Sequence, residues 1–167
     1  MDKIINKVAN SSLQNIDLED FYPKGERVLF DIKDWLYQEI ILKEKDFREK
    51  ANLYNWSLLK DKYVAFYCSV DAIIPSWAYL LLTSKASFYT KKCVVGNLNL
   101  LETVLYVEII SNFDVRQFKE KPVIIKGCAN KPIPATAYTL LIQKLLPVAK
   151  NIMYGEACST VPIYKKK

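Results

Sequence analysis

Short runs of apolar residues alternate with longer segments through the second half of the chain. The runs carry few polar positions, which is typical of strands that are buried on both faces of a parallel sheet. The segments between them are about four turns long and suit crossover helices. The pattern predicts strands at 63–68, 91–96, 122–128 and 151–157, and helices at 75–88, 100–113 and 134–149.

The first sixty residues are less regular. Residues 33–42 fit a helix or a strand equally well by periodicity. The remaining pattern predicts a helix at 2–10, a turn-rich segment at 11–26, a strand at 27–32 and a helix at 45–59.

We therefore expect a single α/β domain over residues 1–167. Its architecture would be three layers, with a mainly parallel sheet of four or five strands and helices on both faces. Residues 1–60 would form a helical and edge-strand N-terminal part, and residues 62–160 a repeated βα core.

One sequence motif occurs twice, as VAFYCSVDAIIPSWAYLLL at 64–82 and as VIIKGCANKPIPATAYTLLI at 123–142. Each copy joins an apolar strand to a helix through a loop with a cysteine and a proline. Tyr79 and Tyr138 occupy equivalent positions in the two helices, where packing against the sheet is the expected role. A shorter copy, IMYGEACSTVPIYKKK, closes the chain. The repetition predicts a thiol at the end of each of three strands.

Ligands of open parallel sheets bind outside the carboxyl ends of the strands. The residues predicted at those ends include three thiols, two carboxylates and a set of small or polar groups. The thiols are Cys68, Cys128 and Cys158, and the carboxylates are Asp71 and Glu156. The candidate ligand-binding residues are Asn97, Asn130, Gly127, Gly155 and Lys131.

If the three thiols converge, they can bind zinc or an iron–sulfur cluster, with Asp71 or Glu156 as a further ligand. A different class of function is a non-enzymatic binding or adaptor module, in which the cysteines are packing residues of the core. A third is a thiol-dependent enzyme, with Cys68 or Cys158 activated by a helix N-terminus and by Lys126 or Lys131. The sequence does not decide whether the protein is an enzyme.

The composition and the motifs of the chain exclude several kinds of catalytic and cofactor site. The chain has no histidine, which removes the Ser-His-Asp triad, the Cys-His pair and every histidine-containing zinc site. Neither GxGxxG nor GxxxxGK[ST] occurs, so no nucleotide cofactor is predicted.

The net charge of +6 comes mainly from lysine, with arginine only at Arg27, Arg48 and Arg116, which disfavours nucleic-acid binding. We expect no secretory signal, no membrane span and a cytoplasmic location with reduced thiols. The expected partner is a small ligand or a metal, and the oligomeric state is not predicted.

Several long segments resemble a known family. They are IDLEDFYPKGERVLFDIKDWL, ILKEKDFREK, DKYVAFYCSVDAIIPSWAY and VAKNIMYGEACSTVPIYKKK. Over essentially the whole chain the sequence resembles domain of unknown function 2480, an uncharacterised family found mainly in Bacteroidetes. The resemblance implies a small bacterial protein of the cytoplasm and supplies no catalytic residues.

Overall fold

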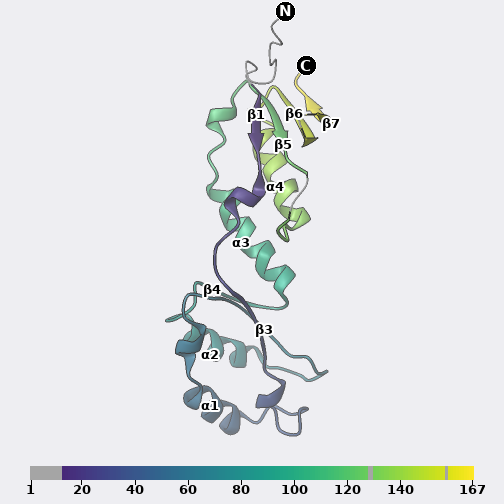
Figure 1. Cartoon of the computed structure of the whole chain (residues 1–167). Coiled ribbons are helices and arrows are strands. Elements are labelled where there is room, and N and C mark those ends of the chain that lie inside the picture. The colour runs from purple at the N-terminus through teal and green to yellow at the C-terminus, as the bar shows by residue number, and fades with distance from the viewer. Residues whose placement is uncertain (1–12, 128–129, 157) are drawn as a thin grey trace, which may run out of the picture. The chain divides into compact units, whose positions relative to one another are not determined.

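Parallel strand pairing dominates the computed structural model, which describes residues 13–127, 130–156 and 158–167 (Figure 1). The chain divides into two compact units. The continuous unit is Lys24–Glu102. The discontinuous unit combines Thr103–Lys167 with the segment that ends at Pro23. The boundary between Glu102 and Thr103 falls inside helix α3.

The continuous unit contains a parallel sheet in the order β2-β3-β4. Its strands are β2 (Arg27–Asp31), β3 (Tyr63–Tyr67) and β4 (Lys92–Val95), and its two complete helices are α1 (Glu44–Leu53) and α2 (Ser76–Ala86). Val64 and Phe66 point to one face of the sheet, since side chains alternate along a strand. That face is covered by α1 through Phe47 and Ala51, and by α2.

Two polar contacts stabilise this unit, one between its two ends and one between α1 and the segment after it. Arg27 at the start of β2 forms an ion pair with Glu102 of α3, with 2.6 Å between Nε and Oε1. Glu102 is the one buried charged residue among the described residues, and the bond compensates for its loss of hydration. Trp56 donates a hydrogen bond of 2.8 Å to the Ala51 carbonyl, which anchors the segment after α1.

The discontinuous unit contains a sheet in the order β1-β5-β6-β7. The first three strands are parallel, and β7 is antiparallel to β6. The strands are β1 (Gln14–Ile16), β5 (Pro122–Ile125), β6 (Asn151–Glu156) and β7 (Ser159–Lys165), and the helices are α3 (Leu98–Asn112) and α4 (Ala135–Leu145). Val123, Ile125 and Ile152 form the core with Tyr106 and Ile110 of α3 and with α4.

The two units share one scaffold. In each, a central strand is followed by a helix and by a further parallel strand, while a short N-terminal strand pairs with the other side of the central one. The helices bury equivalent positions four residues apart, which gives one apolar stripe per helix. These positions are Ala78, Leu82 and Ala86 in α2, and Ala137, Leu141 and Leu145 in α4. Each copy of the repeated sequence motif therefore forms the central strand, the following loop and the helix of one unit.

The α/β class and the mainly parallel pairing are confirmed, but the described strands form two sheets instead of one. The reason lies in the N-terminal strands. β2 pairs with β3 and β1 pairs with β5, so each copy of the repeat acquires its own edge strand. Periodicity predicts that a segment is a strand but not which strand it pairs with.

Four segments differ from the sequence prediction. Residues 11–26 were expected to be irregular, but Gln14–Ile16 is strand β1. The expected helix at 45–59 ends at Leu53, and a 3-10 helix at Trp56–Leu59 follows it. The ambiguous segment 33–42 is a 3-10 helix at Lys33–Trp35 and a bridge between Tyr37 and Ile41. Strand β7 was not predicted, and the helix predicted at 2–10 lies outside the described residues.

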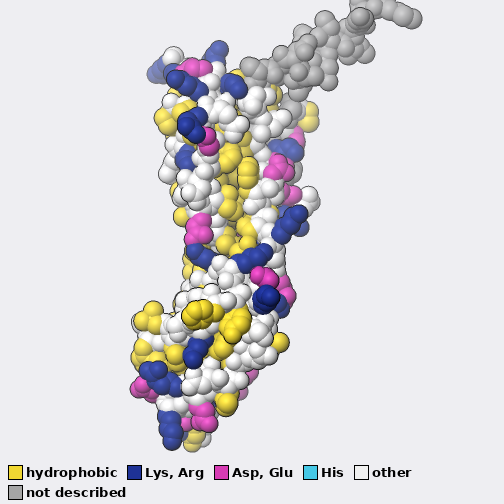
Figure 2. All heavy atoms as spheres, turned by 90° about the vertical axis from the view of Figure 1, so that its left-hand side faces the viewer, with side chains coloured by type: hydrophobic (Ala, Val, Ile, Leu, Met, Phe, Trp, Pro, Cys, Tyr) yellow, Lys and Arg dark blue, Asp and Glu magenta, His cyan; other side chains and the backbone are white. Residues whose placement is uncertain are grey.

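Hydrophobic side chains reach the surface of both units on the face shown in Figure 2, among lysine, arginine, aspartate and glutamate side chains. Over the discontinuous unit these side chains gather in a vertical band, and over the continuous unit they lie in smaller groups (Figure 2). Within the described residues, no helix combines the length and the apolar character that crossing a bilayer requires.

Candidate functional site: an apolar pocket in the discontinuous unit

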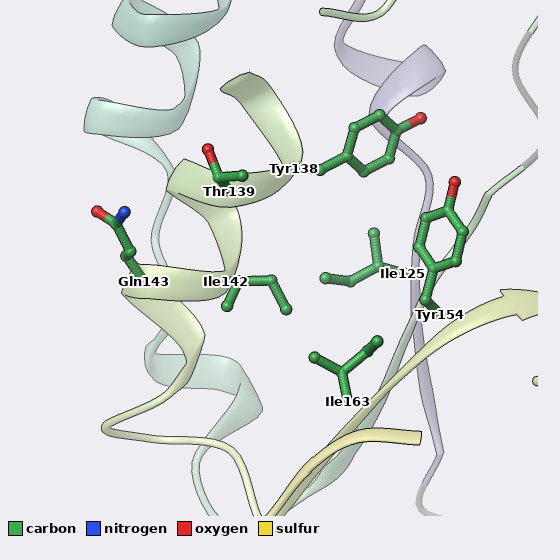
Figure 3. Close-up of a pocket in the computed structure, with 7 residues that line it drawn as sticks. All are labelled: Ile125, Tyr138, Thr139, Ile142, Gln143, Tyr154 and Ile163. Carbon is green, nitrogen blue, oxygen red and sulfur yellow. The ribbon is translucent and has the colours of Figure 1, made fainter. Parts of the chain in front are cut away.

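A pocket of about 300 Å³ opens between α4 and strands β5, β6 and β7 (Figure 3). Its walls are three isoleucines, two tyrosines and two uncharged polar residues. They are Ile125, Ile142, Ile163, Tyr138, Tyr154, Thr139 and Gln143. Figure 3 shows the two tyrosine hydroxyls toward one end and Ile163 toward the other.

Strand register brings these side chains together. Ile125, the last residue of β5, lies opposite Tyr154 of β6, so both side chains stand on the same face of the sheet. Tyr138 and Ile142 are one helical turn apart on α4, as are Thr139 and Gln143.

Ile163 reaches the pocket because of an irregularity in β7. Tyr164 pairs with Ile152, and Pro162 pairs with the next residue of β6, Met153. Ile163 is therefore the extra residue of a bulge, and a bulge turns a side chain out of the regular alternation. Since the continuous unit has no strand equivalent to β7, this wall exists in one unit only.

Tyr154 is held in place by its neighbours. Its hydroxyl donates a hydrogen bond of 3.2 Å to the Gly127 carbonyl. Its ring meets that of Tyr138 edge to face, with 5.9 Å between centroids and 81° between planes. A Cβ on Gly127 would lie 2.7 Å from Tyr154 Cζ, closer than carbon atoms approach. The missing side chain of Gly127 therefore makes room for the tyrosine ring.

The lining is uncharged. The Thr139 hydroxyl donates to the Thr136 carbonyl at 2.9 Å, which leaves its oxygen free to accept. The Gln143 amide is exposed at the rim. Among the described residues that line the pocket there is no carboxylate, amine or thiol. The arrangement is suited to holding an uncharged ligand.

The continuous unit has a cavity of about 400 Å³ at the corresponding place, at the carboxyl ends of β3 and β4. Tyr79 of α2 is the equivalent of Tyr138, and Phe66 is the equivalent of Ile125. Burial raises the pKa of Tyr79, and the charge of a Cys68 thiolate raises it further. The Tyr79 hydroxyl is therefore protonated at neutral pH.

Asp31 fixes the loop beside this cavity. Its Oδ1 accepts hydrogen bonds from the backbone N–H groups of Lys33 at 3.0 Å and Ser69 at 3.1 Å. Burial acts to raise the pKa of Asp31, but hydrogen bonds from Ser69, Lys33 and Tyr67 outweigh it and hold the pKa below its ordinary value. The carboxylate therefore links the end of β2 to the loop after β3.

The predicted thiols have different surroundings. Cys68 is half-buried in the continuous unit, and Cys158 is exposed between β6 and β7 of the discontinuous unit. Cys128 lies outside the described residues. Within the part of the chain that the structure describes, no three thiol or carboxylate side chains are grouped so that they could bind a metal ion. The three-thiol centre stays a prediction.

The two predicted carboxylates belong to different units as well. Asp71 is exposed and lines a hollow with Ile40, Ile41 and Pro75, separate from the cavity that contains Cys68. Glu156 is the last residue of β6, and its charge contributes to raising the pKa of Lys126, after the hydrogen bond and charge of Asp17.

The remaining predicted residues have structural partners. The Asn97 side chain accepts from the Leu100 N–H at 2.9 Å and so caps α3. The backbone N–H groups of Asn130 and Lys131 donate to the Glu19 carboxylate. Gly155 has a φ of +122° at the end of β6, a conformation that favours glycine.

Sequence reasoning missed most of the pocket. The one usable signal was the equivalence of Tyr79 and Tyr138, which marks the same corner of both units. Ile163 and Tyr154 could not be found, because their place depends on the unpredicted strand β7 and on its bulge.

These features define a class of α/β protein in which two similar parallel βαβ units each carry a cavity beside the helix that follows the central strand. The chain belongs to the family described as Protein of unknown function (DUF2480), whose model matches residues 2–166. The resemblance found in the sequence is thereby confirmed. No curated protein and no solved structure matches the chain.

Proposed function

We propose that this protein is a non-enzymatic binding module, which holds a small, uncharged and largely apolar molecule in the pocket of the discontinuous unit. The observation that supports the proposal is the lining itself: three isoleucines and two tyrosines around about 300 Å³, with no charged side chain. Small-molecule sites are commonly apolar pockets from about 300 Å³ upward, with a few polar groups that orient the ligand.

The polar groups of the pocket lie at its margins. The tyrosine hydroxyls stand at one end, and Thr139 and Gln143 line the α4 side (Figure 3). A ligand would therefore place its apolar part against the isoleucines and any hydrogen-bonding group at an edge.

The expected affinity is moderate. Burying about 200 Å² of apolar ligand surface gains roughly 5 kcal/mol. An edge or face contact with the two tyrosine rings adds about 1 kcal/mol. Loss of translational freedom offsets part of this gain of about 6 kcal/mol, so we expect a Kd between about 0.1 mM and 1 mM.

The test is a titration with N-phenyl-1-naphthylamine, an uncharged dye whose fluorescence rises in apolar surroundings. We expect saturable binding to the full chain and a loss of at least about fivefold in affinity in Ile163→Asn, because an amide in the wall is desolvated by the ligand. The matched control is Val161→Asn, which changes an exposed apolar residue of the same strand that does not line the pocket.

Two results would contradict the proposal: no saturable binding to the unaltered protein, or equal losses in the two variants. Metal analysis of the same preparation tests the centre predicted around Cys68, Cys128 and Cys158. Near-stoichiometric zinc or iron, absent from a folded Cys128→Ala variant, would favour the metal-binding hypothesis over the binding module.

A further inference from the structure

The cavity of the continuous unit differs from the apolar pocket in its chemistry. It lies at the carboxyl ends of two parallel strands, the position at which open parallel sheets bind ligands. Its walls mix aliphatic and aromatic side chains with a thiol and two phenols. They are Phe66, Tyr67, Cys68, Val70, Ala72, Ile74, Tyr79, Val95 and Gly96.

This space is open because the residue beside it is smaller than its equivalent in the other unit. In the discontinuous unit, Tyr154 extends along the sheet and its ring fills the space beside Gly127. Val95 takes the place of Tyr154 in the continuous unit, since Val95 pairs with Phe66 as Tyr154 pairs with Ile125. The short valine side chain cannot reach Cys68, the counterpart of Gly127, so the corresponding volume is left to a ligand.

Hydrogen bonds fix the backbone beside the cavity in the absence of a ligand. Asp31 holds the Ser69 N–H at 3.1 Å, and the Gly96 N–H donates to the Phe66 carbonyl at 2.9 Å. Gly96 has a φ of +142°, which a residue with a side chain adopts only with strain. A site of this kind does not have to be ordered by its ligand, which favours affinity.

Tyr79 provides the group that selects a ligand. Its side chain is half-buried, and within the described residues its hydroxyl makes no hydrogen bond. The Tyr67 hydroxyl, in contrast, is engaged with Asp31. Since the Tyr79 hydroxyl stays protonated, it can donate to an acceptor inside the cavity.

We propose that this cavity is a second binding site, independent of the apolar pocket, for a small uncharged molecule whose carbonyl oxygen accepts a hydrogen bond from Tyr79. The apolar part of the ligand packs against Ile74 and Val95, above the buried Phe66 ring. This site distinguishes between ligands by hydrogen bonding, whereas the apolar pocket distinguishes between them by shape and polarity.

The test compares acetophenone with isopropylbenzene, which has nearly the same shape and no acceptor. Binding is followed by the backbone amide signals of Cys68 and Gly96 in ¹⁵N-labelled full chain. We expect acetophenone to bind about 3–10 times more tightly than isopropylbenzene, the range expected for one neutral hydrogen bond. In Tyr79→Phe the two affinities should become equal, while isopropylbenzene binding is kept.

The matched control is Tyr138→Phe, which removes the equivalent hydroxyl in the other unit and should leave the ratio at Cys68 and Gly96 unchanged. A second measurement uses the thiol: saturating acetophenone should slow alkylation of Cys68 by iodoacetamide at least about threefold if the site fills. Equal affinities in the unaltered protein, or shifts confined to Tyr154 and Ile163, would overturn the second site. The latter outcome would leave the apolar pocket as the binding site.

Discussion

The helix after the central strand buries the same three positions in both units, with Leu82 in α2 and Leu141 in α4 at the middle of each stripe. A glycine at the end of the third strand is also shared, since Gly96, directly after β4, and Gly155, near the end of β6, both have positive φ. The pair beside the cavity is not shared. It is Gly127 with Tyr154 in one unit and Cys68 with Val95 in the other.

The shared positions belong to the scaffold of each unit, and the positions that differ lie beside the cavities. Positions that fill the space between helix and sheet are equivalent in the two units because both helices must cover the same type of sheet. Positions at the strand ends differ, because the scaffold does not require a particular side chain there. The two cavities therefore have the same place in the fold and different chemistry.

The largest loss of stability is expected from substitutions at the buried helix positions that the two units share. Leu82→Ala and Leu141→Ala should each lower the free energy of unfolding by about 2–5 kcal/mol, because each removes a fully buried side chain and leaves a cavity. Urea denaturation measures the loss. Tryptophan fluorescence reports the continuous unit, which contains Trp35, Trp56 and Trp77, and circular dichroism reports both.

The matched control is Leu80→Ala, since Leu80 lies on the same helix as Leu82 with 69% of its surface exposed. Its cost should stay within about 0.5 kcal/mol. If the free energy of unfolding falls by less than about 1 kcal/mol in either core variant, the apolar stripe of that helix does not make the expected contribution to the stability of its unit.

An intermediate effect is expected where the units differ. Gly127→Ala places a methyl group against the Tyr154 ring, which is 37% exposed and can swing away. The variant should lose the bond from Tyr154 to the Gly127 carbonyl, at a cost of about 1 kcal/mol in stability. Dye binding to the apolar pocket should weaken more clearly than stability, because the displaced ring is one of its walls.

The double variant Gly127→Ala with Tyr154→Val tests the same point, since it imitates the small residues of the continuous unit. If the two positions are coupled through the ring, the double variant should be more stable than the sum of the two single changes predicts. Additive effects would show that Gly127 and Tyr154 act separately.

The smallest effect is expected from Asp31 and depends on pH. Hydrogen bonds keep the folded-state pKa below the ordinary value of 3.8, so the carboxylate stabilises the fold above that pH and the contribution is lost as pH falls through the folded-state pKa. Asp31→Asn should lower the free energy of unfolding by about 0.5 kcal/mol at pH 6, because the amide oxygen of asparagine can still accept a hydrogen bond. The difference should shrink below pH 3.8 in urea denaturation curves.

Asp34→Asn is the control for this change, because Asp34 is an exposed carboxylate three residues further along the chain, in the 3-10 helix Lys33–Trp35. It should leave the stability of the protein unchanged at pH 6. A difference between Asp31→Asn and the unaltered protein that is constant from pH 6 to acid would contradict a role for the charge.

Much of the fold could be read from periodicity. The strands β3, β4, β5 and β6 and the helices α2, α3 and α4 lie where continuous apolar runs and helical segments predicted them. β1 was missed because three residues are too few to show a period, and β7 because its exposed pattern with Pro162 resembles a polar tail. Both segments are strands because they pair with a neighbouring strand: β1 pairs with β5, and β7 pairs with β6.

The candidate site was much harder to predict. The sequence pointed to strand ends and to cysteines, and it identified Tyr79 and Tyr138 as equivalent, but it linked neither tyrosine to a cavity. The pocket residues Tyr154 and Ile163 are ordinary apolar positions in the sequence, and only pairing, a bulge and the room beside Gly127 bring them together.

The sequence by itself determined the class of the protein and its repetition, because burial on both faces and the stripe of each helix are local patterns that a single segment carries. The tertiary structure decided that the strands form two sheets, that Cys68 and Cys158 belong to different units, and where the cavities open. These properties depend on pairing between distant segments, and hydrogen bonding between strands is the same for nearly every residue type.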